Sequence, residues 1–204
     1  MPDTSSVPKE ASHATSQENN DASTKIVFDD EADFERAQRG LIATLPEGKV
    51  TIDNQTVWDC SQYDFLRENS SAPDTVHPGL WRQGRLNAIH GLFEVMDGVW
   101  QVRGYDISNL TLVAGKTGWI LIDVLTTAAT AKACLELANE HLGARPVKAV
   151  IYTHSHADHF GGILGVTTAE EVERGQVRII APEGFLEEVV NENVIAGAAM
   201  ARRA

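Results

Sequence analysis

The chain has 204 residues, of which 43% are hydrophobic, and this is enough for one globular domain of ordinary size. Its 17 Lys and Arg residues against 29 Asp and Glu residues give a formal net charge of −12, which argues against attraction to nucleic acid or to anionic lipid. We therefore expect no nucleic-acid partner. An anionic substrate is not excluded, because a bound divalent cation would supply local positive charge.

The two cysteines and the apolar runs bear on the compartment. Cys60 and Cys134 are far apart and form no CxxC pattern, so they indicate neither a disulfide framework nor a thiolate zinc site. Cys134 lies among apolar helix positions and is expected to be a packed core thiol. The sequence shows no secretory signal and no run near the ~18 apolar residues of a membrane span. It therefore predicts a cytoplasmic protein without a membrane span.

Residues 1–25 are rich in Ser, Thr, Asn, Asp and Glu and contain no Phe, Trp or Tyr. A segment of this composition cannot bury enough apolar surface to offset the entropy lost on ordering. We predict a disordered polar tail here, and we expect that removal of residues 1–23 leaves the stability of the folded core nearly unchanged.

Residues 26–92 are predicted to form an N-terminal helix and an extended arm. The helix is indicated by apolar residues at roughly helical spacing that end before Pro46: Phe34, Ala37, Leu41 and Leu45. From Trp58 to Leu92, turn residues are frequent and no period is sustained, so we expect an extended arm laid over the core.

Residues 93–204 are predicted to form a layered α/β domain. After Gly91, turns with glycine divide short β-branched and aromatic runs, "LFEVMDGVWQVRG", "NLTLVAG" and "GWILID", which is typical of a hairpin-rich sheet. The next segment has a helical apolar face and ends at a glycine, "TTAATAKACLELANEHLG", and a strand follows, "VKAVIYT". Helical patterns then flank one further strand, "VRIIA". A meander followed by alternating helices and strands predicts a layered α/β fold.

Directly after the strand "VKAVIYT", four potential metal ligands occur within six positions: His154, His156, Asp158 and His159. They would lie at the carboxyl end of a strand, where open α/β sheets place their chemistry. His154 and His156 would point the same way, toward one metal position. Asp158 and His159 belong to the next bend and could face a second position, so the site could hold two neighbouring metal ions. Imidazole and carboxylate suit Zn²⁺, with Fe or Mn as substitutes.

The alternative interpretation is that these are merely polar loop residues, because short motifs recur by chance. Four ligands in register, between a buried strand and the pair Gly161–Gly162, argue against it. We expect the two glycines to let the backbone turn away without side-chain obstruction.

Asp123 closes the apolar run "GWILID" and leaves two interpretations open. Its carboxylate can orient a ligand imidazole from outside the coordination sphere. Equally, it can be a turn residue or a helix-start cap before Thr126 and Thr127.

The motif HxHxDH after an apolar strand resembles the metallo-β-lactamase superfamily, whose αββα sandwich holds one or two metal ions at the edge of its sheets. Longer segments narrow the resemblance to the alkyl sulfatase branch, the linear alkyl and dodecyl sulfate hydrolases: "HPGLWRQGRLNAIHGLFEV", "QVRGYDISNLT", "GWILIDVLTT", "ARPVKAVIYTHSHADHFGG" and "APEGFLEEVVNENVIAGAAMARRA". The resemblance runs from about Leu45 to Ala204. It implies the first half of the sandwich, preceded by an N-terminal extension.

By this resemblance, His154 and His156 would hold a first Zn²⁺ ion, and Asp158 and His159 a second. The two metals would activate water and stabilise charge on the oxygens of a primary alkyl sulfate such as dodecyl sulfate. In such enzymes two glutamates and a further histidine complete the coordination, and they would lie past Ala204, with the sulfate contacts and the helical dimerisation segment. The resemblance thus implies the N-terminal part of a zinc-dependent sulfuric ester hydrolase, inactive alone and homodimeric only when complete.

Two alternatives to a partial alkyl sulfatase stay open. One is another lactamase-fold hydrolase, such as a thioesterase, although the long specific segments argue against it. The other is a non-catalytic metal-binding half-domain that associates with a separate partner.

Overall fold

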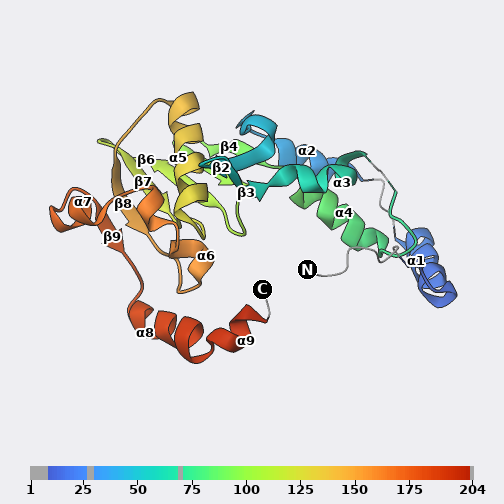
Figure 1. Ribbon diagram of the computed structural model, residues 1–204. Coiled ribbons are helices and arrows are strands. Elements are labelled where there is room, and N and C mark those ends of the chain that lie inside the picture. Colours follow the sequence, from blue (N-terminus) through green and yellow to red (C-terminus); the bar gives the residue numbers. More distant parts are fainter. Residues whose placement is uncertain (1–8, 27–29, 69–70, 203–204) are drawn as a thin grey trace. The chain divides into compact units, whose positions relative to one another are not determined.

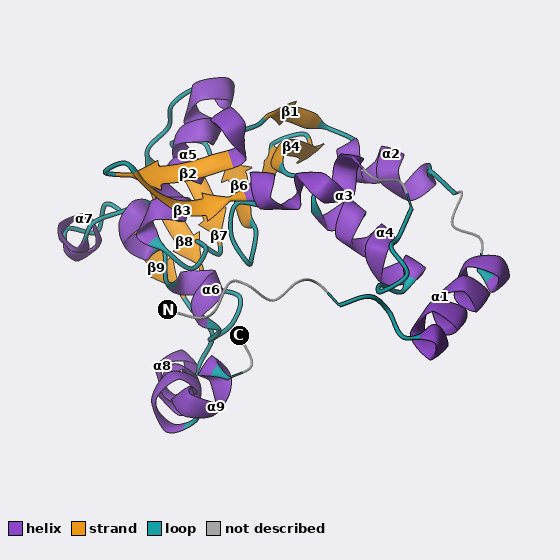
Figure 2. Ribbon diagram, turned by 45° about the vertical axis from the view of Figure 1, so that its right-hand side comes forward, coloured by secondary structure: helices purple, strands orange, loops and turns teal. Residues whose placement is uncertain are grey.

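The computed structural model describes the chain with short gaps, over residues 9–26, 30–68 and 71–202. It separates into two compact units, Met1–Ala37 with Tyr63–Ala88, and Gln38–Gln62 with Ile89–Ala204. Figures 1 and 2 show that the first unit is helical and that the second contains the sheet. All residues predicted for the site lie in the second unit.

Helices form the first unit in the part of the chain that the structure describes: α1 (His13–Lys25), α2 (Ala32–Gln38), α3 (Asp64–Glu68) and α4 (Pro78–Asn87). Arg82 of α4 donates to Asp33 Oδ2 of α2 over 3.1 Å, and its guanidinium lies 5.2 Å from the centre of the Phe34 ring. The buried Trp81 packs against Phe65 of α3 with 5.8 Å between ring centres. Aromatic contacts and one partly buried ion pair therefore hold this unit.

The segment 26–92 differs from its prediction in two places. The helix ends earlier than Pro46, because Gly40 takes a left-handed φ of 78° and strand β1 (Leu41–Ala43) follows. The expected arm contains helices instead: α4 begins at the N-cap His77, whose Nδ1 accepts from Gly79 N over 3.1 Å, with Pro78 next. Proline at the first helical position is a start signal that periodicity alone does not register.

Helix α1 lies inside the segment for which composition predicts disorder. Ser12 caps it by accepting from Thr15 N over 3.2 Å, and the helix buries none of its residues. The structure does not test the prediction that removal of residues 1–23 leaves the stability of the folded core nearly unchanged, so it stays a prediction.

Strands of the second unit, within the described residues, form one seven-stranded sheet in the order β1-β4-β5-β6-β7-β8-β9. Besides β1, its members are β4 (Gly91–Met96), β5 (Val99–Arg103), β6 (Leu110–Ala114), β7 (Trp119–Ile122), β8 (Val147–Ile151) and β9 (Arg178–Ile180). From β1 to β7 neighbours are antiparallel, and β7, β8 and β9 run parallel. The predicted change from a meander to alternating helices and strands is confirmed.

Helix α5 (Ala128–Leu142) connects β7 to β8 and begins at Thr127, whose hydroxyl accepts from Thr130 N over 3.2 Å. Its buried stripe comprises Thr130, Ala131, Cys134, Leu137 and Ala138. The helix also contacts the separate hairpin of β2 (Lys49–Ile52) and β3 (Gln55–Asp59), beside which it lies in Figure 1. Burial raises the pKa of the Cys134 thiol, as expected for a packed core cysteine.

Short helices make up the rest of the second unit: η1 (Pro46–Gly48), η2 (Cys60–Tyr63), α6 (Ala157–Phe160), η3 (Ile163–Gly165), α7 (Ala169–Glu173), α8 (Phe185–Val190), η4 (Asn191–Ile195) and α9 (Gly197–Ala201). The edge strand β9 exposes all three of its residues. By contrast Leu112, Trp119 and Leu121 on β6 and β7 are completely buried. Buried residues of the meander strands and of α5 therefore form the core.

Candidate metal centre

The four predicted ligands lie together at the carboxyl end of β8. His154 and His156 belong to the loop that follows the strand, while Asp158 and His159 lie in α6. Strand β7 runs parallel to β8 and ends at the same edge, so Asp123, directly after it, comes beside them. The position agrees with the sequence-based prediction of a site at a strand end.

The ligand atoms approach one another in two pairs. Nε2 of His154 lies 3.0 Å from Nδ1 of His156, and Nε2 of His159 lies 3.3 Å from Oδ2 of Asp158. Two ligand atoms on a tetrahedral zinc ion are roughly 3.3 Å apart when each bond is about 2.0–2.1 Å long. The ring centres of His154 and His159 are 4.0 Å apart, which brings the two pairs side by side. This arrangement fits two neighbouring metal positions with two ligands each.

Each position is nevertheless incomplete in the part of the chain that the structure describes. There, no group of three or more His, Cys, Asp or Glu side chains is arranged to hold one metal ion. Catalytic zinc sites ordinarily have three protein ligands and structural sites four. The donor set is chemically suited to zinc but partial, and the ligand roles stay predictions.

Each imidazole also has an oxygen partner on the nitrogen that lies outside these pairs. The contacts are His154 Nδ1 to Thr153 Oγ1 at 2.9 Å, His156 Nε2 to Glu192 Oε1 at 3.3 Å and His159 Nδ1 to Asp123 Oδ2 at 2.7 Å. When the ring hydrogens occupy these outer nitrogens, each inner nitrogen presents its lone pair to the other member of its pair. A cation requires that arrangement, because a ligand imidazole must present a lone pair to the metal.

Asp123 is the residue whose role the sequence left open. Its side chain is 10% exposed and accepts hydrogen bonds from Thr153 N at 2.9 Å and Thr153 Oγ1 at 2.8 Å, besides its contact with His159. The cap of α5 is Thr127 instead. This geometry favours the orienting role over the capping role, and the orientation of a metal ligand by Asp123 remains a prediction.

Two polar residues near the centre carry no motif and were missed by sequence reasoning. The buried carboxylate of Asp106 accepts from Thr126 N at 3.1 Å and from the hydroxyls of Thr126 and Thr130, each at 2.5 Å. Two residues on, the Ser108 hydroxyl donates to the backbone carbonyl of Asp158. The loop between β5 and β6 is therefore tied both to the start of α5 and to the ligand-bearing helix α6.

Gly161 and Gly162 serve close packing, which corrects the expectation that they let the backbone turn. Their φ angles of −59° and −81° are open to any residue. A Cβ on Gly162 would lie 2.0 Å from Val124 O, and one on Gly161 would lie 2.3 Å from Thr126 O. Val124 N also donates to His159 O over 2.8 Å. Because Gly161 and Gly162 have no side chains, α6 can lie directly on the segment that follows β7.

That segment has an unusual backbone. Asp123 and Leu125 both take left-handed φ angles, 58° and 64°, although neither is glycine and both are buried. Such a conformation costs on the order of 1 kcal/mol or more for a residue with a Cβ. It persists because the surrounding contacts fix it, and here those contacts belong to the candidate site.

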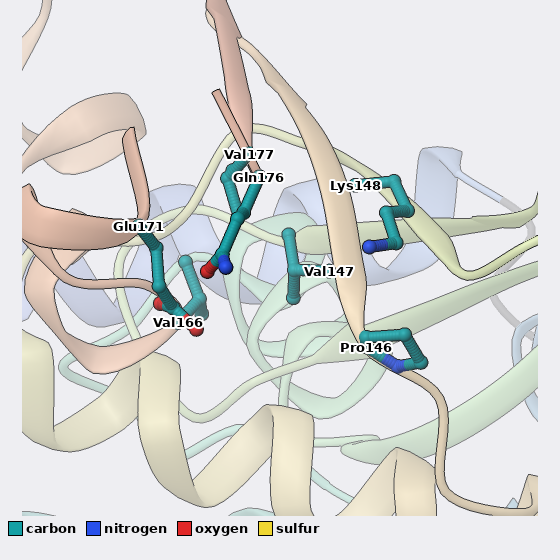
Figure 3. A pocket seen from close by; sticks show the side chains of 7 residues that line it. All are labelled: Pro146, Val147, Lys148, Val166, Glu171, Gln176 and Val177. Carbon is teal, nitrogen blue, oxygen red and sulfur yellow. The ribbon is translucent and has the colours of Figure 1, made fainter. Parts of the chain in front are cut away.

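A cavity of about 290 Å³ lies at the opposite, amino end of β8, lined by Pro146, Val147, Lys148, Val166, Glu171, Gln176 and Val177. Figure 3 shows Lys148 and Glu171 on opposite sides of it. Glu171 completes the capping box of α7: it accepts from Thr168 N over 2.9 Å, and this bond, with that from Thr167, lowers the pKa of the carboxyl group. Its acidic group therefore serves to cap helix α7.

Comparisons with known proteins bear on the fold and the family of the chain. Residues 103–198 match the family model described as the metallo-beta-lactamase superfamily. Over this segment the chain resembles the metallo-β-lactamase superfamily. Its relatives include a linear primary-alkylsulfatase of Pseudomonas sp, 49% identical over 96% of this chain and 29% of the relative. The alkyl/aryl-sulfatase BDS1 of Saccharomyces cerevisiae is 47% identical over 96% of this chain and 30% of its own length.

Among solved structures, the stereoselective inverting sec-alkylsulfatase Pisa1 of Pseudomonas sp. matches with a TM-score of 0.89 and 48% identity. The match covers 96% of this chain and 31% of that protein. The chain therefore spans about three tenths of the length of the alkylsulfatases that it matches. The predicted α/β lactamase-like fold and the resemblance to alkyl sulfatases are confirmed.

The match to the superfamily model implies metal ions, while their position, identity and number belong to the proposal below. A further expectation concerned the membrane. Among the helices of the described ranges, none combines the length and the hydropathy needed to cross a bilayer.

Proposed function

We propose that this chain is the metal-binding part of an alkylsulfatase, and that the whole protein hydrolyses alkyl sulfate esters to alcohol and sulfate. One observation carries the proposal: two donor pairs lie side by side at the end of β8 in a chain that resembles an alkylsulfatase. Over 96% of this chain, the sequence is 49% identical to a linear primary-alkylsulfatase. The relatives named above favour this reading over a thioesterase or a non-catalytic half-domain.

In this proposal His154 and His156 hold one Zn²⁺ ion, and Asp158 and His159 hold a second. Bound zinc supplies Lewis-acid chemistry, which activates water and stabilises negative charge on the sulfate oxygens. The protein's own side chains prepare the ligands. Asp123 keeps Nδ1 of His159 engaged, so that Nε2 presents its lone pair beside Asp158.

Charge supports a metal-dependent way of binding the ester. The chain carries a formal net charge of −12, so its long-range field repels a sulfate group. Two divalent ions at the end of β8 reverse this locally. In this proposal the substrate is an alkyl sulfate such as dodecyl sulfate, as the names of the relatives suggest, and a homodimer is expected only of the complete enzyme.

The first test of this proposal measures zinc. After dialysis against a mild chelator, the chain should retain Zn²⁺ weakly or below two ions per molecule, because each position has two ligands from the described residues. The variants His154→Ala and Asp158→Ala should each lose one of the two positions. Elemental analysis measures the content, and tight retention of two ions would show that other residues of this chain complete the site.

The second test measures sulfate release from dodecyl sulfate with added Zn²⁺. The 204-residue chain alone should be inactive, and a protein of the relatives' length that contains it should be active. His154→Ala should abolish that activity, whereas Glu188→Ala at an exposed position of α8 should preserve it. Activity that survives His154→Ala would refute the proposed function.

A further inference from the structure

Glu192 lies far from the HxHxDH motif in sequence but reaches it in space. It belongs to the π-helical turn η4 after α8, and its side chain is 27% exposed. Oε1 lies 3.3 Å from Nε2 of His156, and Oε2 accepts from the Ser155 hydroxyl over 3.2 Å. Both oxygens of one carboxylate therefore contact two consecutive residues of the ligand loop.

The contact with His156 is on the ring nitrogen that lies away from His154. Nδ1 of the same ring faces Nε2 of His154 at 3.0 Å. A carboxylate beside Nε2 favours the tautomer that carries its hydrogen there, and this leaves the lone pair on Nδ1. A neutral imidazole with that lone pair is the form that binds a metal ion.

From this geometry we infer that Glu192 is a positioning residue of the first metal position, an assignment that rests on the metal binding of the proposed function. It sets the tautomer and the ring orientation of His156, as Asp123 does for His159 in the second pair. The two donor pairs thus have the same construction, each with one histidine backed by a carboxylate from a distant segment.

Two other roles for Glu192 fit the geometry less well. As a direct ligand its oxygens would have to lie beside Nδ1 of His156, yet they lie beside Nε2. A simple surface ion pair with Glu192 would require His156 to carry hydrogens on both ring nitrogens. The hydrogen on Nδ1 would then point at Nε2 of His154 and leave no lone pair for a metal ion. The neighbouring Asn193 donates to Val189 O over 2.9 Å, so the turn has a hydrogen bond of its own that does not involve Glu192.

The test compares zinc affinity, by competition with a chromophoric chelator, in the whole chain and three variants. Glu192→Ala should weaken Zn²⁺ binding by roughly 10- to 100-fold, the usual effect of losing such a partner. Glu192→Gln should recover part of this loss, because its amide oxygen still accepts from Nε2. The matched control, Glu188→Ala, changes an exposed acidic residue of the preceding helix and should bind as the wild type does.

Two further readouts separate positioning from a structural role. Co²⁺ substituted for zinc should give a changed ligand-field spectrum in Glu192→Ala and an unchanged one in Glu188→Ala. Without metal, the melting temperatures of both variants should equal that of the wild type. A lowered metal-free melting temperature in Glu192→Ala would assign Glu192 a structural role and overturn the inference.

The outcomes also distinguish this inference from the proposed function. A wild-type chain that binds no zinc would remove the proposed function and the role of Glu192 together. Zinc binding by Glu192→Ala that equals that of Glu188→Ala, in a chain whose wild type binds zinc, would overturn the role of Glu192 alone.

Discussion

The two sides of strand β8 bury their residues very differently. On the meander side, Trp119 and Leu121 of β7 are completely inaccessible, whereas on the other side Ile179 and Ile180 of β9 are 39% and 43% exposed. Beyond β9, a hollow of about 450 Å³ between the strand and α8 is lined mainly by apolar side chains, Phe185 among them. The candidate metal centre follows β8, at the boundary between these regions. It is contacted from both sides: Asp123 and Ser108 reach it from the meander side, and Glu192 reaches it from the segment beyond β9.

The largest expected contrast is between core residues of the two sides. Leu121→Ala should lower the free energy of unfolding by about 2–5 kcal/mol, because it opens a cavity among fully buried neighbours. Ile180→Ala should cost about 1 kcal/mol or less, because the side chain is already partly in water. Urea unfolding followed by circular dichroism measures both values. Equal losses would show that β9 is as firmly packed as β7.

The second contrast concerns glycines. Gly162→Ala should destabilise the protein by about 1–3 kcal/mol, because its Cβ would meet Val124 O and Ala131 Cβ, and it should weaken zinc binding as α6 moves. Gly197→Ala is the matched control in α9, where a Cβ meets nothing within 4 Å. It should be neutral or slightly stabilising. Thermal unfolding and zinc titration of the pair check this, and a neutral Gly162→Ala would contradict the packing described for α6.

The smallest effect is expected from the N-terminal segment. Removal of residues 1–23 takes away most of α1, which buries none of its residues, so the melting temperature should be unchanged. Differential scanning calorimetry of the shortened and full chains tests this. A melting temperature lowered by several degrees would mean that the segment packs on the folded part. The N-terminal segment would then be a third region to compare with the two sides of β8.

Local signals predicted the meander, α5 and β8 well, because strand alternation, helical spacing and terminal glycines all favour the same structure there. They failed where one residue outweighs the period, as Gly40 does before β1 and as Pro78 does at the start of α4. A window of apolar positions averages over such residues. Boundaries were therefore less predictable than elements.

The candidate site shows the same division. The four predicted ligands lie within six positions, from His154 to His159, so their spacing alone predicts a metal site. Ser108 and Glu192 reach the same loop from segments on either side of it, and no local pattern distinguishes them from other polar residues. Their positions depend on how the sheet and the helices pack, which periodicity does not encode.

The left-handed backbone at Asp123 and Leu125 limits the amino acids that these two positions can accept. Glycine at position 125 would relieve the backbone but would remove a side chain that is 1% exposed, while a β-branched residue would fill the space in a backbone conformation that it strongly disfavours. At position 123, asparagine tolerates the backbone but replaces one carboxylate oxygen, which accepts from Thr153 or faces His159, with a donor. Each replacement therefore relieves one unfavourable feature and introduces another. In a saturation library of residues 120–130 selected for folded, zinc-binding protein, these two positions should therefore admit the fewest amino acids.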